Sequence, residues 1–195
     1  MHAPSSNHRY KREDCIVFFK THDRWGELSN MAAGFPIIIN GTKILTSEAL
    51  FQACRFPHLP DIQRLLIDQA SPMAAKMKSR PYRKDTRTDW EAVNNDIMRW
   101  CVHVKLAQNW KSFGQILLAT GAKTIVEESH KDSYWGAIAA DEDTLQGVNV
   151  LGRMLTELRD TLLSAGESLR IVQPPAVENF LLLGLPIDTI HSTLD

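Results

Sequence analysis

The sequence has little of what marks a secreted, disulfide-stabilised or membrane-spanning protein. Its three cysteines, Cys15, Cys54 and Cys101, are odd in number and widely spaced, so they predict neither a disulfide framework nor a CxxC metal site. The longest apolar runs, Phe35–Ile39 and Phe180–Leu185, are far shorter than the roughly 20 residues of a membrane-spanning helix. The N-terminus also lacks the apolar stretch of a secretory signal. We therefore expect a cytosolic or nuclear protein with no membrane partner.

The sequence also lacks a large excess of either basic or acidic residues. The 22 Lys and Arg residues nearly balance 23 Asp and Glu residues, which gives a formal net charge of −1. A protein that binds a long nucleic-acid backbone usually has a clear basic excess, so this class is disfavoured. The one basic cluster, Arg9–Arg12, lies in a polar N-terminal tail that we expect to be frayed. With 44% hydrophobic and 23% charged residues, the remaining chain has the composition of a globular protein.

Several common catalytic patterns do not occur either. The seven histidines are scattered singly, without an HxH or HExxH arrangement, so the sequence predicts no metal site and no cofactor. There is no Gly-x-Ser-x-Gly nucleophile elbow, and Cys54 and Cys101 lie in helical segments where cysteines usually pack rather than react. The segment Gly147-Val-Asn-Val-Leu-Gly152 lacks the glycine spacing of a dinucleotide fingerprint.

The patterns that are present predict an α+β fold, dominated by helices, in a single compact domain with a small β-sheet. Asn40-Gly41, between two apolar runs, is the strongest hairpin signal, because this dipeptide tolerates the positive φ angles of a type I′ turn. Apolar, β-branched runs predict strands at 15–19 and 123–127, and 81–89 reads as charged and irregular. Apolar periodicity and capping residues predict helices from Ser47 to before Pro57, and at 59–70, 72–78, 90–104, 113–119 and 151–162.

Length suggests one domain of ordinary size with two additions. We expect a polar tail at 1–14, a catalytic domain at 15–165 and a C-terminal extension at 166–195. About 30 residues are too few to bury a core of their own, so the extension should pack on the domain.

One helix face carries a polar stripe of interest. Glu48, Gln52 and Arg55 lie at i, i+4 and i+7, opposite a face of apolar residues. In one interpretation Glu48 complements the helix dipole and the other two are solvated. In the other, the stripe faces a cleft and Glu48 transfers protons. Spacing alone leaves both open.

Three loops allow similar alternatives. Asn30 ends the loop 25–30, where it can face a ligand or bond its own turn. In the segment 127–136, directly after a predicted strand, Asp132 and Trp135 can form a site, or a helix cap beside a core anchor. The loop 147–152 opens the last helix and can hold a phosphate on its backbone amides.

Short motifs in a fixed order resemble the NADAR family, also called YbiA-like, over roughly residues 15–163. The resemblance rests on Phe18-Phe19, Leu28-Ser-Asn30, Thr46-Ser-Glu48, Phe51-Gln-Ala53, Ser71-Pro72, Ala75-Lys76, Arg80, Trp90-Glu91, Met98, Lys105, Leu117-Leu-Ala-Thr120, Ile125-Val-Glu127, Asp132, Tyr134-Trp-Gly136, Gly147-x-Asn149-x-Leu-Gly152, Leu155 and Arg159.

The resemblance implies an N-glycosidase. Family members hydrolyse the C–N bond between a ribose phosphate and an aminated pyrimidine of early riboflavin synthesis, or remove ADP-ribose from guanine bases. The implied partner is thus a phosphorylated ribosyl or ADP-ribosyl substrate, with an ADP-ribosylated nucleic-acid base included.

The chemistry of this bond assigns roles to the matched residues. Positive charge develops on the sugar and the departing base needs a proton, so a pair of carboxylates is required, and Glu48 and Asp132 match the motifs. Trp90 and Trp135 are expected to stack the base, and Asn30 and Asn149 to hold ribose hydroxyls. The remaining expected substrate contacts are Arg55, Lys76, Arg80, Lys105, Gly136, Gly147 and Arg159, of which Lys76, Arg80 and Arg159 are the candidates for phosphate.

The chain departs from the family pattern at Arg55, where YbiA-like members typically carry lysine. Arginine keeps the charge but forms no Schiff base at neutral pH, because its guanidinium stays protonated. If the family lysine only binds phosphate, arginine can replace it. If it reacts with opened ribose, Lys76 or Lys105 must act instead.

Two other classes of function compete with the hydrolase. One is a catalytically silent module that binds ADP-ribose or nucleotides in the same pocket. The other is a structural partner protein that uses the apolar Phe180–Leu185 segment.

Overall fold

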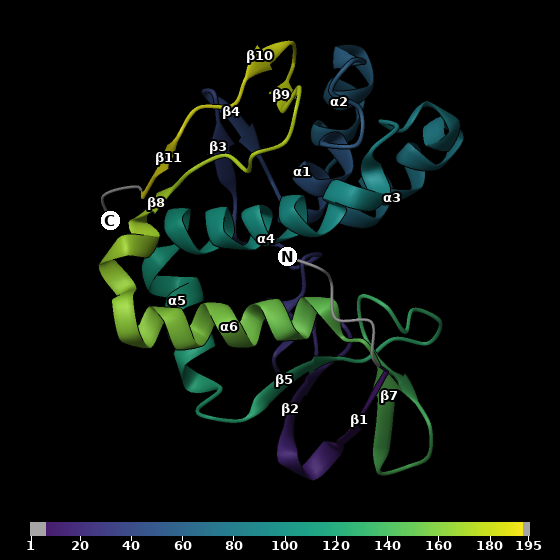
Figure 1. Cartoon of the computed structure of the whole chain (residues 1–195), viewed down its shortest axis with the longest axis vertical. Helices are drawn as coiled ribbons and strands as arrows, with labels where there is room; N and C mark the ends of the chain where they lie inside the picture. Colours follow the sequence, from purple (N-terminus) through teal and green to yellow (C-terminus); the bar gives the residue numbers. More distant parts are fainter. Residues whose placement is uncertain (1–6, 193–195) are drawn as a thin grey trace. The chain divides into compact units, whose positions relative to one another are not determined.

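The computed structural model describes residues 7–192 and divides the chain into two compact units. The first unit comprises the N-terminal residues up to Ser29 together with Gly114–Gly166, and the second comprises Asn30–Phe113 together with the residues from Glu167 onward. The described residues form six α-helices and short strands in small sheets, which confirms the α+β class with helices dominant (Figure 1).

The first unit contains two small sheets and one long helix. Strands β2 and β5, both expected from their β-branched sequences, pair in parallel, and helix α6 packs on β5. Strands β1, β7 and β6 form an antiparallel sheet in that order. Buried Val126, Ala137 and Leu145 form a core cluster between these elements. The elements are β1 (His8–Lys11), β2 (Cys15–Phe18), β5 (Thr124–Glu127), β6 (Ile138–Ala139), β7 (Thr144–Gly147) and α6 (Val150–Ala165).

The expectation of a frayed N-terminal tail is wrong for residues 8–14. Strand β1 pairs along its whole length with β7, and a short 3₁₀ helix, η1 (Arg12–Asp14), leads into β2. The side chain of Arg12 makes two hydrogen bonds to Glu128, with Nη1–Oε2 and Nη2–Oε1 distances of 2.8 and 2.7 Å. Residues 1–6 of the predicted tail lie outside the described part of the chain.

Replacing Arg12 with glutamine is expected to lower the free energy of unfolding at pH 7 by about 1 kcal/mol, because a bidentate, half-buried ion pair is lost. Arg9→Gln is the matched control, since Arg9 and Asp141 are mostly exposed and 3.9 Å apart, and it should change stability little. Urea denaturation of the three proteins measures both effects. Equal losses for the two variants would contradict the prediction.

The effect of Arg12 should also depend on pH. The hydrogen bond from Arg12 lowers the pKa of Glu128 below its ordinary value, against a smaller opposing effect of burial. The pair's contribution is therefore complete above the ordinary glutamate pKa and declines as the pH falls through the lowered pKa. The difference between wild type and Arg12→Gln should shrink between about pH 5 and pH 3, and a constant difference would exclude this cause.

The second unit contains a cluster of helices and a set of short antiparallel strands. Helix α1 packs against α2, α3 and α4, and α4 also contacts β3, β8 and β11. Helix α5 begins in this unit and ends in the first. The helices are α1 (Ser47–Ala53), α2 (Pro60–Ile67), α3 (Pro72–Ser79), η3 (Arg80–Asp85), α4 (Trp90–Gln108) and α5 (Trp110–Ala119).

Capping residues explain where these helices begin. The Thr46 hydroxyl accepts a hydrogen bond from Ala49 N at the start of α1, and Ser71 accepts one from Ala74 N at the start of α3. Pro72 occupies the first turn of α3, as expected. The prediction of an irregular segment at 81–89 is wrong in part, because the 3₁₀ helix η3 covers Arg80–Asp85.

The predicted hairpin is confirmed. Strands β3 (Ile37–Ile39) and β4 (Thr42–Ile44) pair through Asn40 and Gly41, whose φ angles are 48° and 74°. Positive φ at both turn positions is what a type I′ turn requires.

The C-terminal segment folds over the second unit. Its strands β8 (Ile171–Val172), β9 (Leu181–Leu182), β10 (Leu185–Pro186) and β11 (Ile190–His191) form two antiparallel pairs, drawn in yellow above α4 in Figure 1. The ring of Phe180 packs edge-on against Trp100 of α4 at 4.9 Å. The Gln63 side chain on α2 bonds both Leu181 O and Leu183 N. Among residues 7–192, no helix is long and apolar enough to cross a membrane.

Candidate active site

Glu48 lies in a buried hydrogen-bond network in the second unit. Glu48 lies in the first turn of α1 with a side chain that is only 5% exposed, and Gln52 is buried as well, so the interpretation that leaves Gln52 solvated is wrong. Asn30 Nδ2 donates to Glu48 Oε2 at 3.1 Å, and Gln52 Nε2 donates to Oε1 at 2.9 Å. Two N–H donors directed at the two oxygens suit a carboxylate, which only accepts. The fold thus holds Glu48 in one orientation.

The loop before α1 builds one side of this network. Asn30 O accepts hydrogen bonds from Glu48 N and Ser47 Oγ, at 3.0 and 3.2 Å, which ties the loop to the first turn of α1. The Asn30 side chain therefore faces Glu48 and not its own turn. Its Oδ1 is buried without a hydrogen-bond partner among the described residues, so an acceptor remains beside the carboxylate.

Gln52 extends the network to Arg55 and α3. Its Oε1 accepts from Arg55 Nη1 at 3.4 Å, and Ser79 Oγ lies 2.9 Å away. The predicted stripe on α1 is therefore a connected polar row, and both Glu48 and Gln52 are buried. Mutual hydrogen bonds within such a buried row hold its side chains in one arrangement.

Trp90 contacts the outer end of this row. The Arg55 guanidinium lies over its ring at 4.6 Å from the centroid, and Phe51 packs against it at 5.1 Å. Trp90 is only 6% exposed, so it holds Arg55 in place and offers little free surface for stacking a base. The geometry favours this positioning role over the predicted stacking role.

The other predicted cations of the second unit differ in their surroundings. Lys76 on α3 and Arg80 in η3 are exposed. Lys105 on α4 is 1% exposed, and its Nζ lies 4.7 and 4.1 Å from the ring centroids of Phe35 and Phe113. The burial of Lys105 disfavours the predicted direct contact with substrate. Roles for Lys76 and Arg80 stay predictions.

Asp132 lies in the first unit, on an exposed turn after β5. Its Oδ1 accepts hydrogen bonds from Tyr134 N and Trp135 N at 3.0 and 2.9 Å. Asp132 therefore caps a turn, whereas the structural alternative expected from the sequence was a helix cap. Trp135 is half-buried and packs edge-on against Tyr134. A catalytic role for Asp132 and a stacking role for Trp135 stay predictions.

The structure disfavours phosphate binding by the loop 147–152, because three of its amides already have partners within the first unit. Asn149 N, Val150 N and Leu151 N donate to the carbonyls of residues 136, 134 and 135, respectively, at 3.0 Å each. A helix N-terminus with its amides already paired has none left for an anion.

The close approach of these segments in the first unit depends on Gly136, Gly147 and Asn149. A Cβ atom on Gly136 would lie 2.6 Å from Glu127 O, and one on Gly147 would lie 2.6 Å from Ala137 Cα. Asn149 is fully buried in a left-handed conformation, where its side chain accepts from Glu127 N and donates to Ile125 O. These contacts favour structural roles for the three residues over the predicted contacts with substrate.

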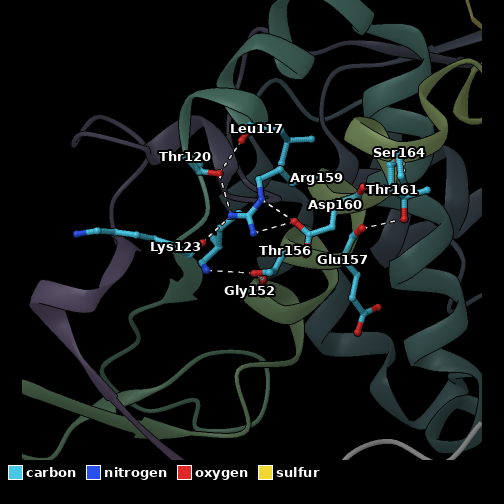
Figure 2. Close-up of polar contacts among 11 residues, drawn as sticks. Leu117, Thr120, Lys123, Gly152, Thr156, Glu157, Arg159, Asp160, Thr161 and Ser164 are labelled. Carbon is cyan, nitrogen blue, oxygen red and sulfur yellow. Dashed lines mark hydrogen bonds and ion pairs between the residues drawn. The ribbon is translucent and has the colours of Figure 1, made fainter.

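The side chain of Arg159 also forms hydrogen bonds with other residues of the first unit. Figure 2 shows its guanidinium directed from α6 to Thr120, Lys123 and Asp160. Nη1 donates to Thr120 Oγ1 at 3.2 Å and to Lys123 O at 2.5 Å, and Nε donates to Asp160 Oδ1 at 3.0 Å. With 2% exposure, this arrangement favours a structural role over the predicted phosphate contact.

The cysteines are packed, as expected. Cys54 and Cys101 are buried and Cys15 is partly buried, and all three are free thiols. Burial raises the pKa of Cys101 well above its ordinary value, with a further contribution from the hydrogen bond to Cys54, and burial also raises the pKa of Cys15. Thiols with raised pKa values contain little of the reactive thiolate.

We therefore expect the native protein to react slowly with a disulfide reagent such as Ellman's reagent at pH 7, and all three thiols to react at once in denaturant. The absorbance of the released thiolate measures both rates. Rapid labelling of Cys54 or Cys101 in the native protein would contradict the packing described above.

Several polar residues near the Glu48 network in the second unit lie outside the motifs recognised in the sequence. Ser79 joins the Glu48 network, and Arg83, Thr86 and Arg87 line a cleft with Arg55 and Trp90. The only signal for them was the concentration of charge at 80–89. Within residues 7–192, no group of three or more His, Cys, Asp or Glu side chains is arranged to hold a metal ion.

Comparison with known proteins defines the class of enzyme. The chain is 36% identical over 154 residues to the N-glycosidase YbiA of Escherichia coli, covering 77% of this chain and 90% of that protein. It is 32% identical over 149 residues to an N-glycosidase of Nostoc punctiforme, covering 75% and 92%. A solution structure of Escherichia coli YbiA matches this fold with a TM-score of 0.67 and 34% identity, covering 79% and 88% of the two chains. The protein is thus an N-glycosidase.

Its family follows from a direct match of residues 17–163 to the NADAR domain model. The chain belongs to the NADAR domain family. A riboflavin biosynthesis protein of Vibrio vulnificus is 34% identical over 152 residues, which cover 77% of this chain and 39% of that protein.

Proposed function

We propose that the protein hydrolyses the bond between the anomeric carbon of a phosphorylated ribose or ADP-ribose and a nitrogen of a nucleobase-like amine. The two substrate types are the ribosylaminopyrimidine phosphate of early riboflavin synthesis and ADP-ribosylated guanine. The names of the relatives support this proposal, since they include N-glycosidases and riboflavin biosynthesis proteins.

The observation that carries the proposal is the buried carboxylate of Glu48, which accepts one hydrogen bond at each of its two oxygens. As the C–N bond breaks, its electron pair leaves with the base nitrogen, and the sugar gains positive charge. A fixed carboxylate stabilises that charge, because it needs no reorientation during the reaction. Water then adds its oxygen to the anomeric carbon and loses a proton, and the departing nitrogen takes up a proton.

Glu48 suits the role of carboxylate or base better than that of proton donor. Both of its oxygens already accept hydrogen bonds from amide N–H groups of Asn30 and Gln52. A protonated Glu48 would have to direct its O–H past these donors, whereas an ionised one matches them. Of the two carboxylates that match the family motifs, Asp132 is then the proposed proton donor.

Arg55 fits an anion-binding role in this scheme. Its guanidinium stacks on Trp90 and bonds Gln52, so it is held next to the Glu48 network. A fixed guanidinium binds phosphate without covalent chemistry. The substitution of the family lysine by Arg55 is therefore compatible with hydrolysis if phosphate binding is the role of that position.

The test is a mass-spectrometric assay of the full chain with each of the two substrate types. We expect one of them to yield a free base and a free sugar phosphate or ADP-ribose in equal amounts. Absence of both products from both substrates would contradict the proposal. It would then favour the alternative of a silent module that binds ADP-ribose or nucleotides.

A further inference from the structure

A basic cleft of about 450 Å³ adjoins Trp90 in the second unit. It is formed where the end of α1 meets the segment between η3 and α4, and Arg87 N donates to Arg55 O at 2.9 Å to join the two. The lining residues are Arg55, Arg83, Thr86, Arg87, Thr88, Trp90 and Glu91.

Three donors around this cleft are buried without a partner. Arg55 Nε, Thr86 Oγ1 and Arg87 Nη1 have no hydrogen bond within the described part of the chain. A buried donor that has lost water and gained no acceptor is costly, and such groups rarely occur together without a reason. An anionic oxygen would satisfy all three, because the two arginine N–H groups can only donate and the threonine hydroxyl can donate as well.

Arg87 is the most firmly held of the three. It is 7% exposed, and its Nε and Nη2 donate to the Asp89 carboxylate at 2.6 and 3.0 Å. Nη2 also donates to Glu178 O at 2.6 Å. These bonds fix the plane of the guanidinium and leave Nη1 as the one nitrogen of this group without a partner among residues 7–192.

The charges around the cleft favour an anion. Arg55, Arg83 and Arg87 carry three positive charges, against Asp89, which is paired with Arg87, and Glu91. Burial lowers the pKa of Arg55, and the charge of Arg83 lowers it further. An anion between the two arginines would relieve this repulsion.

From these observations we infer that Arg55, Thr86 and Arg87, with Arg83 at the rim, form a binding site for a phosphate or diphosphate group. The site rests on the proposed function in one respect, since it assigns the bound group to the substrate. It differs from the phosphate contacts expected from sequence, of which Lys76 and Arg80 are exposed on other turns and Arg159 is used internally.

The C-terminal segment takes part in this site. Glu178, whose carbonyl holds Arg87, lies outside the residues 17–163 that match the family. An adjoining cleft of about 1130 Å³ shares Thr86, Arg87 and Thr88 with the anion site and is also lined by Glu178, Asn179 and Leu181. It is large enough for the organic part of a phosphorylated ligand.

Isothermal titration calorimetry of the full chain with inorganic phosphate and with pyrophosphate tests the site without requiring turnover. We expect at least one anion to bind, and Arg55→Gln, Thr86→Val and Arg87→Lys each to weaken binding about tenfold or more, because each removes a charge-assisted or buried donor. Arg64→Gln is the control, since Arg64 is an exposed arginine of α2, and it should bind as wild type does.

Absence of binding for both anions, or wild-type affinity in the variants, would overturn the inference. If Arg87→Lys fails to fold by circular dichroism, Thr86→Val and the exposed Arg83→Gln decide, since neither removes a buried ion pair.

Competition between pyrophosphate and the substrate tests whether the bound anion corresponds to a group of the substrate. Pyrophosphate should raise KM for the substrate without changing kcat, and binding without competition would overturn this assignment. Arg87-dependent binding of pyrophosphate by a protein that releases no base would contradict the proposed function and leave the anion site standing.

Discussion

Changing Glu48 to glutamine is expected to lower kcat about a thousandfold, a loss typical of removing a catalytic carboxylate, while substrate affinity stays within a few-fold of wild type. The carboxylate is expected to act on charge that develops only in the transition state, so its removal should affect turnover more than binding. Steady-state kinetics of base release give kcat and KM, and calorimetry gives the affinity.

Two further variants make this result specific. Asp61→Asn removes an acid from an exposed turn of α2 and should leave both constants unchanged. Glu48→Asp keeps the charge but withdraws it by one methylene, so we expect an intermediate rate. Retention of more than a tenth of wild-type turnover by Glu48→Gln would show that Glu48 only supports the structure.

Glu48→Gln also has a structural cost that must be measured. The new amide would direct an N–H group at either Asn30 Nδ2 or Gln52 Nε2, both of which are donors. Stability should fall by about 1–3 kcal/mol, the usual cost of a buried polar group that loses its partner. Thermal unfolding therefore accompanies the kinetics, at a temperature where both proteins are folded.

Replacing Arg159 with alanine should have the largest effect on stability, a loss of about 2–5 kcal/mol in the free energy of unfolding, the range seen when a large buried side chain is cut back to alanine. The change removes the side-chain donor that bonds the Lys123 carbonyl and the buried Thr120 hydroxyl, and it leaves a cavity beneath α6. Leu163→Ala on the same helix is the control, because that side chain is 67% exposed, and it should change stability by less than about 0.5 kcal/mol.

The same variant separates the two interpretations of Arg159. If it holds the strand and helix together, the folded fraction of Arg159→Ala should show a wild-type KM. If it contacts a phosphate, KM should rise about tenfold or more, as expected for the loss of a charge-assisted hydrogen bond. Chemical denaturation and initial-rate kinetics on one preparation give both answers.

Local signals in the sequence predicted most elements because those elements depend on local chemistry. Asn40-Gly41 and Ser71-Pro72 specify a turn and a helix start without help from the rest of the fold. Strand β1 was missed for the opposite reason. Its residues are polar, and only pairing with β7, more than 130 residues away, makes them a strand.

The candidate site shows the same contrast between residues that local signals reveal and residues whose role depends on distant contacts. Glu48 stood out because three polar residues at helical spacing opposed an apolar face, but the sequence cannot tell a solvated row from a buried one. Arg87 carries no periodic signal, and its importance comes from distant Glu178 O and from unpaired neighbours. Asn149 and Arg159 matched a family motif, which indicates that a residue matters but not whether it binds a ligand or other residues.

The bond from Arg87 to Glu178 O couples the segment that matches the NADAR family to the C-terminal segment, which lies outside that match. Because the acceptor is a backbone carbonyl, any amino acid at position 178 can supply it, provided that the chain keeps its course over α2 and α4. Substitutions in the C-terminal segment would then alter ligand affinity through the path of the backbone rather than through side-chain identity. Comparing side chains alone would miss such a dependence, and an insertion or deletion near residues 173–183 would reveal it.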